Sequence, residues 1–401
     1  MEDKKNIYLD NAATTKVDRR VLEAMRPYFS EQYGNASSLH QPGLDARVAV
    51  DRAQAKIASF LGCQKEEVYF TSGATESDNM AILGLIRALD GQAQKKSHLI
   101  VSKIEHDAIL EPAKQLAKEG VEVTFLPVNK KGLVEVEQLR RAVKVNTVLV
   151  SIMYVNNELG TIQPIKEIGQ LIGRLNKKRG AGKNKIYFHT DAVQALSYCD
   201  CQVEKLGVDL LSLSGHKIYG PKGVGAIYIR RGTPLKPLLF GGHQQEGVRS
   251  GTYNVPSIVG LGRAVELLLD ERKLKTENER IKKLRDSLIK GVRAKVSGIL
   301  INGDLAKRVP SNASFIFKGV EGESVVLLLS EKGIAVSTGS ACSSGSLEPS
   351  HVLKALGIKP ELAHGSLRVT LGRFTSQKDI RKFLKELPSA VARLRKISPF
   401  K

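Results

Sequence analysis

Cysteine is scarce in this chain. Only four of its 401 residues are cysteine, namely Cys63, Cys199, Cys201 and Cys342. Four cysteines are too few for the disulfide framework of a small secreted domain, and no two of them have the CxxC spacing of a structural zinc site. We therefore expect free thiols, no structural metal centre and a reducing compartment, the cytoplasm.

Long apolar runs are also missing. No uninterrupted apolar stretch reaches the ~18 residues that a membrane-spanning helix needs. The chain starts Met1-Glu2-Asp3-Lys4-Lys5, which is too polar for the apolar core of a signal peptide. The sequence predicts neither a membrane segment nor secretion.

Acidic residues are outnumbered, with 41 Asp and Glu against 62 Lys and Arg, a net charge of +21. The basic residues gather in stretches such as 174–179 and 272–295, and the second has the pattern of an amphipathic helix with a solvated basic face. Aromatic side chains that could stack on bases do not alternate with these residues. The pattern favours a generally basic surface over direct nucleic-acid binding.

Apolar strand-like runs alternate with helical patterns through the first two thirds of the chain, which is typical of an α/β domain with a mostly parallel, mixed sheet flanked by helices. The runs cover 98–103, 121–126, 147–154, 185–190, 209–213 and 223–230. From about residue 262 the pattern changes to a long helix, short strands, a Gly/Ser loop over 337–346 and terminal helices. We expect a large domain over 15–261 and a smaller α+β domain made of 1–14 and 262–401.

Lys217 is the first candidate for chemistry. It follows an apolar strand, in a glycine-rich turn beside Ser214 and His216. A lysine amine presented at a strand end suits a Schiff base with a carbonyl group. Read alone, the motif fits an ordinary loop lysine equally well, and the spacing of a Walker A loop is absent.

Asp191 and Gln194 could serve pyridoxal phosphate, whose ring nitrogen needs a carboxylate to stay protonated. Asp191 comes directly after the run 185–190, so we expect it at the carboxyl end of that strand. Gln194 lies three residues further on and could reach the ring hydroxyl. By itself, Asp191 fits a helix N-cap just as well.

A phosphate needs fixed hydrogen-bond donors, and the segment from Ser72 to Thr75 could supply them. It leads from an apolar strand end into the periodic run 80–86, so its amides would lie at a helix N-terminus. Capping of that helix by Ser72 or Thr75 is the alternative explanation.

Two more strand ends carry polar residues. His106 follows the strand over 98–103 and could stack on a cofactor ring, and Asn157 follows the strand over 147–154 and could donate to the ring oxygen. Each would usually be a turn residue. Four polar clusters at four strand ends predict one ligand site, because ligands of such sheets bind at the carboxyl ends of the strands.

Cys342 lies in the small-residue stretch Val-Ser-Thr-Gly-Ser-Ala-Cys-Ser-Ser-Gly-Ser (336–346). This composition favours an exposed thiol that could attack a substrate and then reach a partner. Cys63, at a helix end, is interpreted as structural. Cys199 and Cys201 lie in a polar stretch and could be accessible.

Taken together, these motifs show that the chain resembles the cysteine desulfurases of the NifS/IscS type, in the class V aminotransferase family. The resemblance covers nearly the whole chain, from Tyr-Leu-Asp-Asn-Ala-Ala-Thr-Thr (8–15) to Leu-Gly-Arg-Phe (371–374). It is carried by Thr-Ser-Gly-Ala-Thr-Glu-Ser-Asp-Asn (71–79), Val-Asn-Asn-Glu (155–158), Ser-Gly-His-Lys-Ile-Tyr-Gly-Pro-Lys-Gly (214–223), Arg-Ser-Gly-Thr (249–252) and Gly-Ser-Ala-Cys-Ser-Ser (339–344) followed by Leu-Glu-Pro-Ser (347–350). The long cysteine loop is closer to the NifS/IscS group than to the SufS group.

The resemblance implies a fold type I pyridoxal-phosphate enzyme that converts L-cysteine to L-alanine and leaves the sulfur as a persulfide on Cys342. Lys217 would bind the cofactor covalently, with Lys217, Cys342 and His106 as catalytic residues, and Arg368 would bind the substrate carboxylate. The implied cofactor contacts are Ala74, Thr75, Asn157, Asp191, Gln194, Ser214, His216 and, from the other subunit of a homodimer, Thr252. No resident metal is implied, although Cys342 could transiently ligate an iron–sulfur cluster.

The implied acceptor of the sulfur is an iron–sulfur scaffold protein or a tRNA-thiolation enzyme. The chain stops at Lys401, where relatives continue into a tail that docks the scaffold, so scaffold docking is an open expectation. A selenocysteine lyase or aminotransferase is the alternative enzyme, and Cys342 argues against the aminotransferase because that reaction needs no thiol. A basic RNA-binding or assembly protein with a vestigial cofactor site is disfavoured by the presence of Lys217, Asp191, His106 and Arg368.

Overall fold

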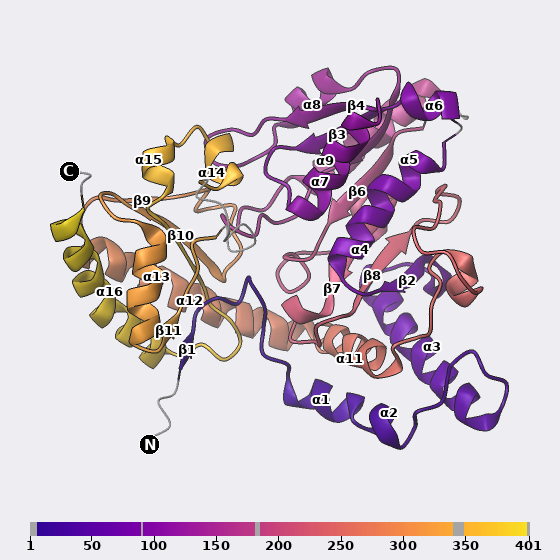
Figure 1. Ribbon diagram of the computed structural model, residues 1–401, viewed down its shortest axis with the longest axis horizontal. Coiled ribbons are helices and arrows are strands. Elements are labelled where there is room, and N and C mark those ends of the chain that lie inside the picture. Colours follow the sequence, from indigo (N-terminus) through magenta and orange to yellow (C-terminus); the bar gives the residue numbers. More distant parts are fainter. Residues whose placement is uncertain (1–5, 90, 181–184, 340–348, 399–401) are drawn as a thin grey trace.

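The computed structural model describes residues 6–89, 91–180, 185–339 and 349–398. Its largest element is a seven-stranded sheet in the order β2-β8-β7-β6-β5-β3-β4, in which β8 runs against both neighbours and every other pair is parallel (Figure 1). The predicted mostly parallel, mixed sheet is thereby confirmed. Its strands are β2 (Val68–Thr71), β3 (His98–Ser102), β4 (Glu122–Leu126), β5 (Thr147–Ser151), β6 (Tyr187–Asp191), β7 (Leu210–Ser214) and β8 (Gly225–Ile229).

Both faces of this sheet are buried, which explains why its strands are almost continuously apolar. Neighbouring strand residues enter different cores: Ile100 and Val150 pack on one side, Leu99 and Leu149 on the other. The first face is covered by α3 (Gln41–Leu61), α8 (Val136–Ala142), α9 (Ile165–Arg179), α10 (Val203–Leu206) and α11 (Val255–Glu266). The second is covered by the π-helical turn η2 (Met80–Gly84), α5 (Leu85–Arg87) and α7 (Asp107–Lys118), and α4 (Ala74–Asn79) packs against η2 and α7.

A second layer of structure lies beside the large sheet (Figure 1). An antiparallel sheet has the order β12-β10-β9, formed by β9 (Ile299–Ile301), β10 (Asn312–Phe317) and β12 (Ser366–Thr370), and β1 (Ile7–Tyr8) pairs in parallel with β11 (Ile334–Ala335). The helices α12 (Glu271–Lys295), α13 (Gly322–Glu331) and α16 (Gln377–Ile397) share a core with these strands. The short helices α14 (His351–Ala355) and α15 (Pro360–Ala363) pack with Ile104, Met153 and Ile316 between the two sheets.

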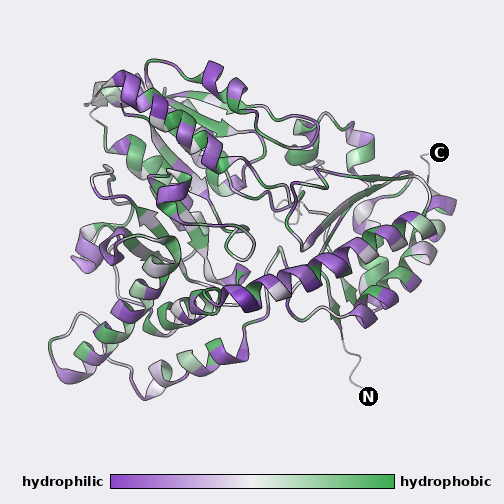
Figure 2. Ribbon diagram, turned by 180° about the vertical axis from the view of Figure 1, so that it is seen from behind, coloured by the Kyte–Doolittle hydropathy of each residue, from purple (hydrophilic) through white to green (hydrophobic). Residues whose placement is uncertain are grey.

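The remaining short elements lie at the periphery or in turns. They are α1 (Arg19–Met25), α2 (Pro27–Ser30), α6 (Gly91–Lys95) and the 3-10 turns η1 (Lys65–Glu67), η3 (Gly215–Lys217) and η4 (Gln244–Gly247). The helices alternate between polar and apolar residues (Figure 2), and among the described residues none is long and apolar enough to cross a membrane.

The expected domain boundary after residue 261 falls inside α11, whose side chains pack with those of α3. The next helix, α12, places Leu274 against the first core and Leu284 and Leu288 in the second. The division into domains over 15–261 and over 1–14 with 262–401 stays a prediction.

Candidate active site

The carboxyl ends of β2, β3, β5, β6 and β7 meet at one edge of the large sheet, because these strands all run in the same direction. A cavity of about 630 Å³ opens there, a size typical of sites for small molecules. It is lined by ten of the predicted site residues: Ala74, Thr75, His106, Asn157, Asp191, Gln194, Ser214, His216, Lys217 and Arg368. Cys342 lies outside the described residues.

Lys217 ends the turn η3 directly after β7, as the apolar run and the glycine-rich motif predict. Its Nζ donates to the carbonyl oxygens of Ala12, at 2.6 Å, and Ala13, at 2.8 Å. Tyr219, two residues on, has a φ of 66°, which a residue with a side chain rarely adopts. The chain therefore leaves the turn through an uncommon backbone conformation, and Lys217 lines the cavity.

Asp191 is the last residue of β6 and is almost completely buried. Its Oδ1 accepts from the backbone N of Val193 at 2.8 Å, so the carboxylate does cap the following turn. Burial raises its pKa, while the hydrogen bond from Val193 N and the nearby His106 and Lys217 oppose the rise. A buried carboxylate of this kind favours a ligand that brings a proton or a positive charge to it.

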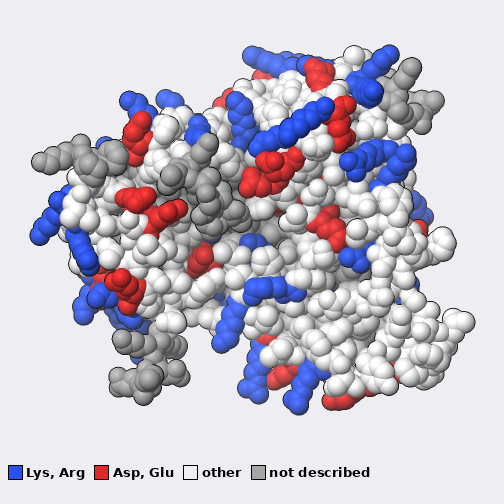
Figure 3. Space-filling view, in the orientation of Figure 1, with Lys and Arg blue, Asp and Glu red and all other residues white. Residues whose placement is uncertain are grey.

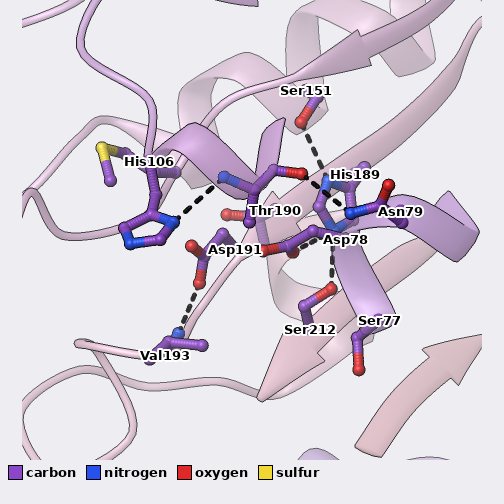
Figure 4. A network of polar contacts seen from close by, with 12 residues as sticks. Ser77, Asp78, Asn79, His106, Ser151, His189, Thr190, Asp191, Val193 and Ser212 are labelled. Carbon is purple, nitrogen blue, oxygen red and sulfur yellow. Dashed lines mark hydrogen bonds and ion pairs between the residues drawn. The ribbon is translucent and has the colours of Figure 1, made fainter. Parts of the chain in front are cut away.

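Behind Asp191 lies a buried polar network that the sequence analysis did not find (Figure 4). Ring nitrogens of His189 are 2.8 Å from Ser151 Oγ and 3.0 Å from Ser212 Oγ, and Nε2 is 3.7 Å from Asp78 Oδ1. Burial lowers the pKa of His189 to about 3 and raises that of Asp78 well above its usual value. Burial therefore favours the neutral form of both side chains in the network behind Asp191.

The low pKa of His189 predicts a loss of stability in acid. The unfolded chain binds a proton to this histidine below pH ~6.5 and the folded chain only near about 3. The unfolded state then holds more protons than the folded state. The free energy of unfolding therefore decreases by about 1.4 kcal/mol for each pH unit as the pH falls from ~6 to ~4. The slope of the unfolding free energy against pH, from urea titrations of cofactor-free protein, should be smaller by that amount in His189→Asn. Equal slopes would contradict a neutral, buried His189.

The segment predicted to hold a phosphate starts α4, with Gly73 as the N-cap in place of Ser72 or Thr75. Gly225 lies opposite, and a Cβ on it would be 2.9 Å from Gly73 Cα, so glycine is required for this close approach. On the other side, His216 Nδ1 is 3.1 Å from Thr14 Oγ1, and burial, aided by Lys217 and Lys222, lowers the pKa of His216 to about 4. The start of α4 and the His216 side chain thus line the same cavity as Lys217.

Arg368, in β12, reaches the same cavity from the smaller sheet and is 3% exposed. One of its terminal nitrogens pairs with Asp10 at 2.8 Å and the other donates to the carbonyl of Asn157 at 3.1 Å. Its buried Nε has no hydrogen-bond partner among the described residues. A buried donor without a partner costs free energy, so this atom favours an anionic ligand.

Cys201 corrects an expectation of accessibility. It is 2% exposed and packs in the first core, while Asp200 turns outward to pair with Lys205. Burial raises the pKa of the partly buried Cys199 to about 12 and that of Cys201 well above its usual value. Both are poor nucleophiles, because the thiolate is the reactive form.

The N-terminal segment around Ala12 and Thr14 also lines the cavity. The sequence analysis named this segment only as part of the family resemblance and assigned it no role in the site. Thr252 is exposed and does not line the cavity, but its segment is tied to α4 by an ion pair of Arg249 with Glu76 at 2.8 Å.

Within the described ranges, no group of three or more His, Cys, Asp and Glu is placed to hold a metal ion.

Comparison with known proteins places the whole chain among similar sequences and folds. The family described as aminotransferase class-V matches residues 7–383. Proteins named cysteine desulfurase IscS are 48% identical in Dictyoglomus turgidum, over 99% of this chain and 98% of that protein, and 49% identical in Methanosarcina thermophila, over 99% and 95%. A structure titled NifS-like protein is 38% identical, with a TM-score of 0.88 over 96% of this chain and 99% of that one. Another, titled SspA in complex with cysteine, is 36% identical, with a TM-score of 0.79 over 92% of this chain and 100% of that one.

Proposed function

Because the chain belongs to the class V aminotransferase family and is a cysteine desulfurase that depends on pyridoxal phosphate, we propose which of its residues perform each part of the reaction. The enzyme converts L-cysteine to L-alanine and retains the sulfur as an enzyme persulfide. The observation that carries our assignment is the meeting of Lys217, Asp191, His106 and Arg368 in one cavity of about 630 Å³.

The cavity fits pyridoxal phosphate by the chemistry of its donors. Lys217 would hold the cofactor through Nζ, Asp191 would keep the ring nitrogen protonated, and His106 would stack on the ring, with Asn157 and Gln194 on its hydroxyl side. The phosphate would lie at the start of α4 with Ala74, Thr75, Ser214 and His216. When bound, the cofactor supplies an electron sink for charge at the substrate α-carbon.

Substrate binding and sulfur transfer are assigned to three side chains. Arg368 would hold the substrate carboxylate, and Lys217 Nζ, once displaced from the cofactor, would carry the proton of the α-carbon. Cys342 Sγ would attack the substrate sulfur. The S–S bond forms as the substrate C–S bond breaks, and the electron pair of that bond stays on the three-carbon fragment. This fragment takes up a proton and leaves as alanine.

The role of Arg368 can be tested by Arg368→Ala. A charge-assisted contact to a carboxylate contributes ~1.5–3 kcal/mol, so the KM for L-cysteine should rise roughly ten- to a hundredfold. Sulfide release against cysteine concentration measures this, with thermal unfolding to show that the variant folds. Arg368→Lys keeps the positive charge but loses the planar guanidinium, so its KM for L-cysteine should lie between those of the wild type and the alanine variant. An unchanged KM in the alanine variant would exclude Arg368 from the substrate site.

The functional unit is proposed to be a homodimer with shared sites. Large exposed apolar side chains gather before and within α3 and near residue 240: Leu22, Phe29, Tyr33, Leu39, Leu44, Val48, Leu239 and Phe240. In Figure 3, few charges cover the lower right of the molecule, where Figure 1 shows α2 and α3. Apolar exposure of this extent is typical of an interface. Thr252, exposed on the segment that Arg249 ties to α4, would then reach the cofactor phosphate of the partner subunit.

Mixing two inactive variants tests the shared site. Lys217→Ala lacks the amine, and Thr252→Trp would block the phosphate position. After subunit exchange, a heterodimer has both defects in one site and none in the other, so an equal mixture should recover about a quarter of the wild-type activity. No recovery despite demonstrated exchange, or a fully active monomer by light scattering, would contradict shared sites.

The destination of the sulfur and the compartment are also proposals. An acceptor protein, such as an iron–sulfur scaffold or a tRNA-thiolation enzyme, would take the persulfide sulfur from Cys342. A cytoplasmic location is supported by the cysteines in the described residues, Cys63, Cys199 and Cys201, all of which are free thiols.

A further inference from the structure

Glu158 is a buried carboxyl group that the assignment above does not use. It is 5% exposed and follows Asn157 in the turn after β5. Its backbone is fixed on both sides, because its N donates to Asn156 Oδ1 at 3.0 Å and its carbonyl accepts from Asn312 Nδ2 at 3.1 Å. The side chain therefore leaves a rigid turn at the edge of the cavity.

The carboxyl group contacts two segments that are close in space and separate in sequence. Ser350 Oγ donates to Glu158 Oε2 at 2.6 Å. Gly339 lies against the same oxygen, since a Cβ on this glycine would be 3.2 Å from Oε2. Residues 340–349, which include Cys342, connect these two contact points along the chain.

Both contact points are themselves anchored. Ser350 caps α14 by accepting from the backbone N of Val352 at 3.1 Å, and its single hydroxyl proton goes to Glu158. Gly339 N donates to Ser337 Oγ at 3.1 Å, and the backbone of Ser337 pairs with that of Arg368. Glu158 thus links the cavity turn, the strand of the substrate arginine and the start of α14.

We propose that Glu158 is a positioning residue, whose carboxyl group holds Gly339 and Ser350 in place and so fixes both chain ends of the segment that delivers the cysteine sulfur. This inference rests on the proposed role of Cys342. The group needs only to accept a hydrogen bond from Ser350, so an amide oxygen can replace it. A loss of position of about 1 Å can cost ~100-fold in rate, which makes the effect measurable.

The test compares Glu158→Ala with Glu158→Gln. In the alanine variant, kcat for sulfide release should fall roughly ten- to a hundredfold, while the KM for L-cysteine and the visible spectrum of the bound cofactor stay within about twofold of wild type. The glutamine variant should stay close to wild type. Ser350→Ala should reproduce the fall in kcat, and the double variant with Glu158→Ala should lose no more than either alone, because both remove the same contact.

Ser376→Ala is the matched control. Ser376 also caps a helix, α16, and donates to a carboxylate, Asp379 Oδ2, at 2.9 Å. It is not among the residues that line the cavity, so kcat should not change. In cofactor-free protein, amide exchange at Val352 and Leu353 should accelerate in Glu158→Ala and not in Ser376→Ala.

The outcomes separate this inference from the proposed function. Full sulfide release by Cys342→Ala would overturn the assignment of the nucleophile. If Cys342→Ala is inactive while Glu158→Ala keeps the wild-type kcat, or if Glu158→Gln is as slow as Glu158→Ala, the positioning role of Glu158 is wrong and the nucleophile assignment stands.

Discussion

Replacement of Cys342 by alanine is expected to lower sulfide release from L-cysteine at least a hundredfold, because the reaction then lacks its acceptor for the substrate sulfur. Cofactor content and the spectral change on adding L-cysteine should persist, since Arg368 and Lys217 are untouched. Sulfide assays under reductant and absorption spectra measure the two effects separately.

The chemistry of the other thiols supports this expectation. Burial is the main cause that raises the pKa of Cys63 and of Cys199 to about 12, and it also raises the pKa of Cys201 well above its usual value. At pH 7, a thiol with a pKa of about 12 is ionised in about one molecule in 100,000, and the thiolate is the nucleophile. None of these three cysteines is prepared for attack.

Cys63→Ala and Cys199→Ala are therefore the matched controls and should keep full sulfide release. Mass spectrometry after one turnover should find the additional sulfur on the peptide that contains Cys342. Wild-type sulfide release by Cys342→Ala, or a persulfide on Cys199, would place the nucleophile elsewhere.

The strands of the large sheet could be predicted because both of its faces are buried. Runs such as Leu99-Ile100-Val101 are apolar at every position, and their residues enter the two cores alternately. The direction of the strands then brings their carboxyl ends together, so polar residues that follow separate runs, such as His106 and Asp191, share a cavity.

Contacts between distant parts of the chain could not be predicted in this way. Arg368 pairs with Asp10, and Lys217 donates to Ala12 and Ala13, although about 200 residues or more separate the partners. Neither the spacing of residues nor their periodicity records which segment a side chain will meet. The arginine is placed by the pairing of β12 with β10 and by the bridge between Asp10 and Thr370, which belong to the tertiary fold.

Polar neighbours also misled the interpretation of Cys201. The surrounding Tyr-Cys-Asp-Cys-Gln suggests exposure. Asp200, however, is the residue that makes the polar contacts of this turn: it accepts from Gln202 N at 3.0 Å and pairs with Lys205 at 2.9 Å. The small cysteine side chain can then face inward and pack as an apolar residue, as free cysteines commonly do.

Substitution of Lys217 by alanine is expected to have the largest effect. The variant should be purified without the yellow colour of a covalently bound cofactor, and sulfide release should fall by roughly three orders of magnitude or more, because it would lose both the proposed covalent anchor and the proposed carrier of the α-carbon proton. Absorption spectra of the purified protein and sulfide assays at saturating pyridoxal phosphate measure these losses.

Lys217→Arg distinguishes this chemical role from a structural one. The amine donates to the carbonyls of Ala12 and Ala13, and so it could simply join the N-terminal segment to the turn after β7. A guanidinium keeps the charge and the donors for these carbonyls, but it stays protonated and cannot exchange a proton with the substrate. If the lysine acts chemically, the arginine variant is as colourless and inactive as the alanine variant while its thermal stability stays close to wild type. Recovery of colour and activity with arginine would instead assign Lys217 to the structure alone.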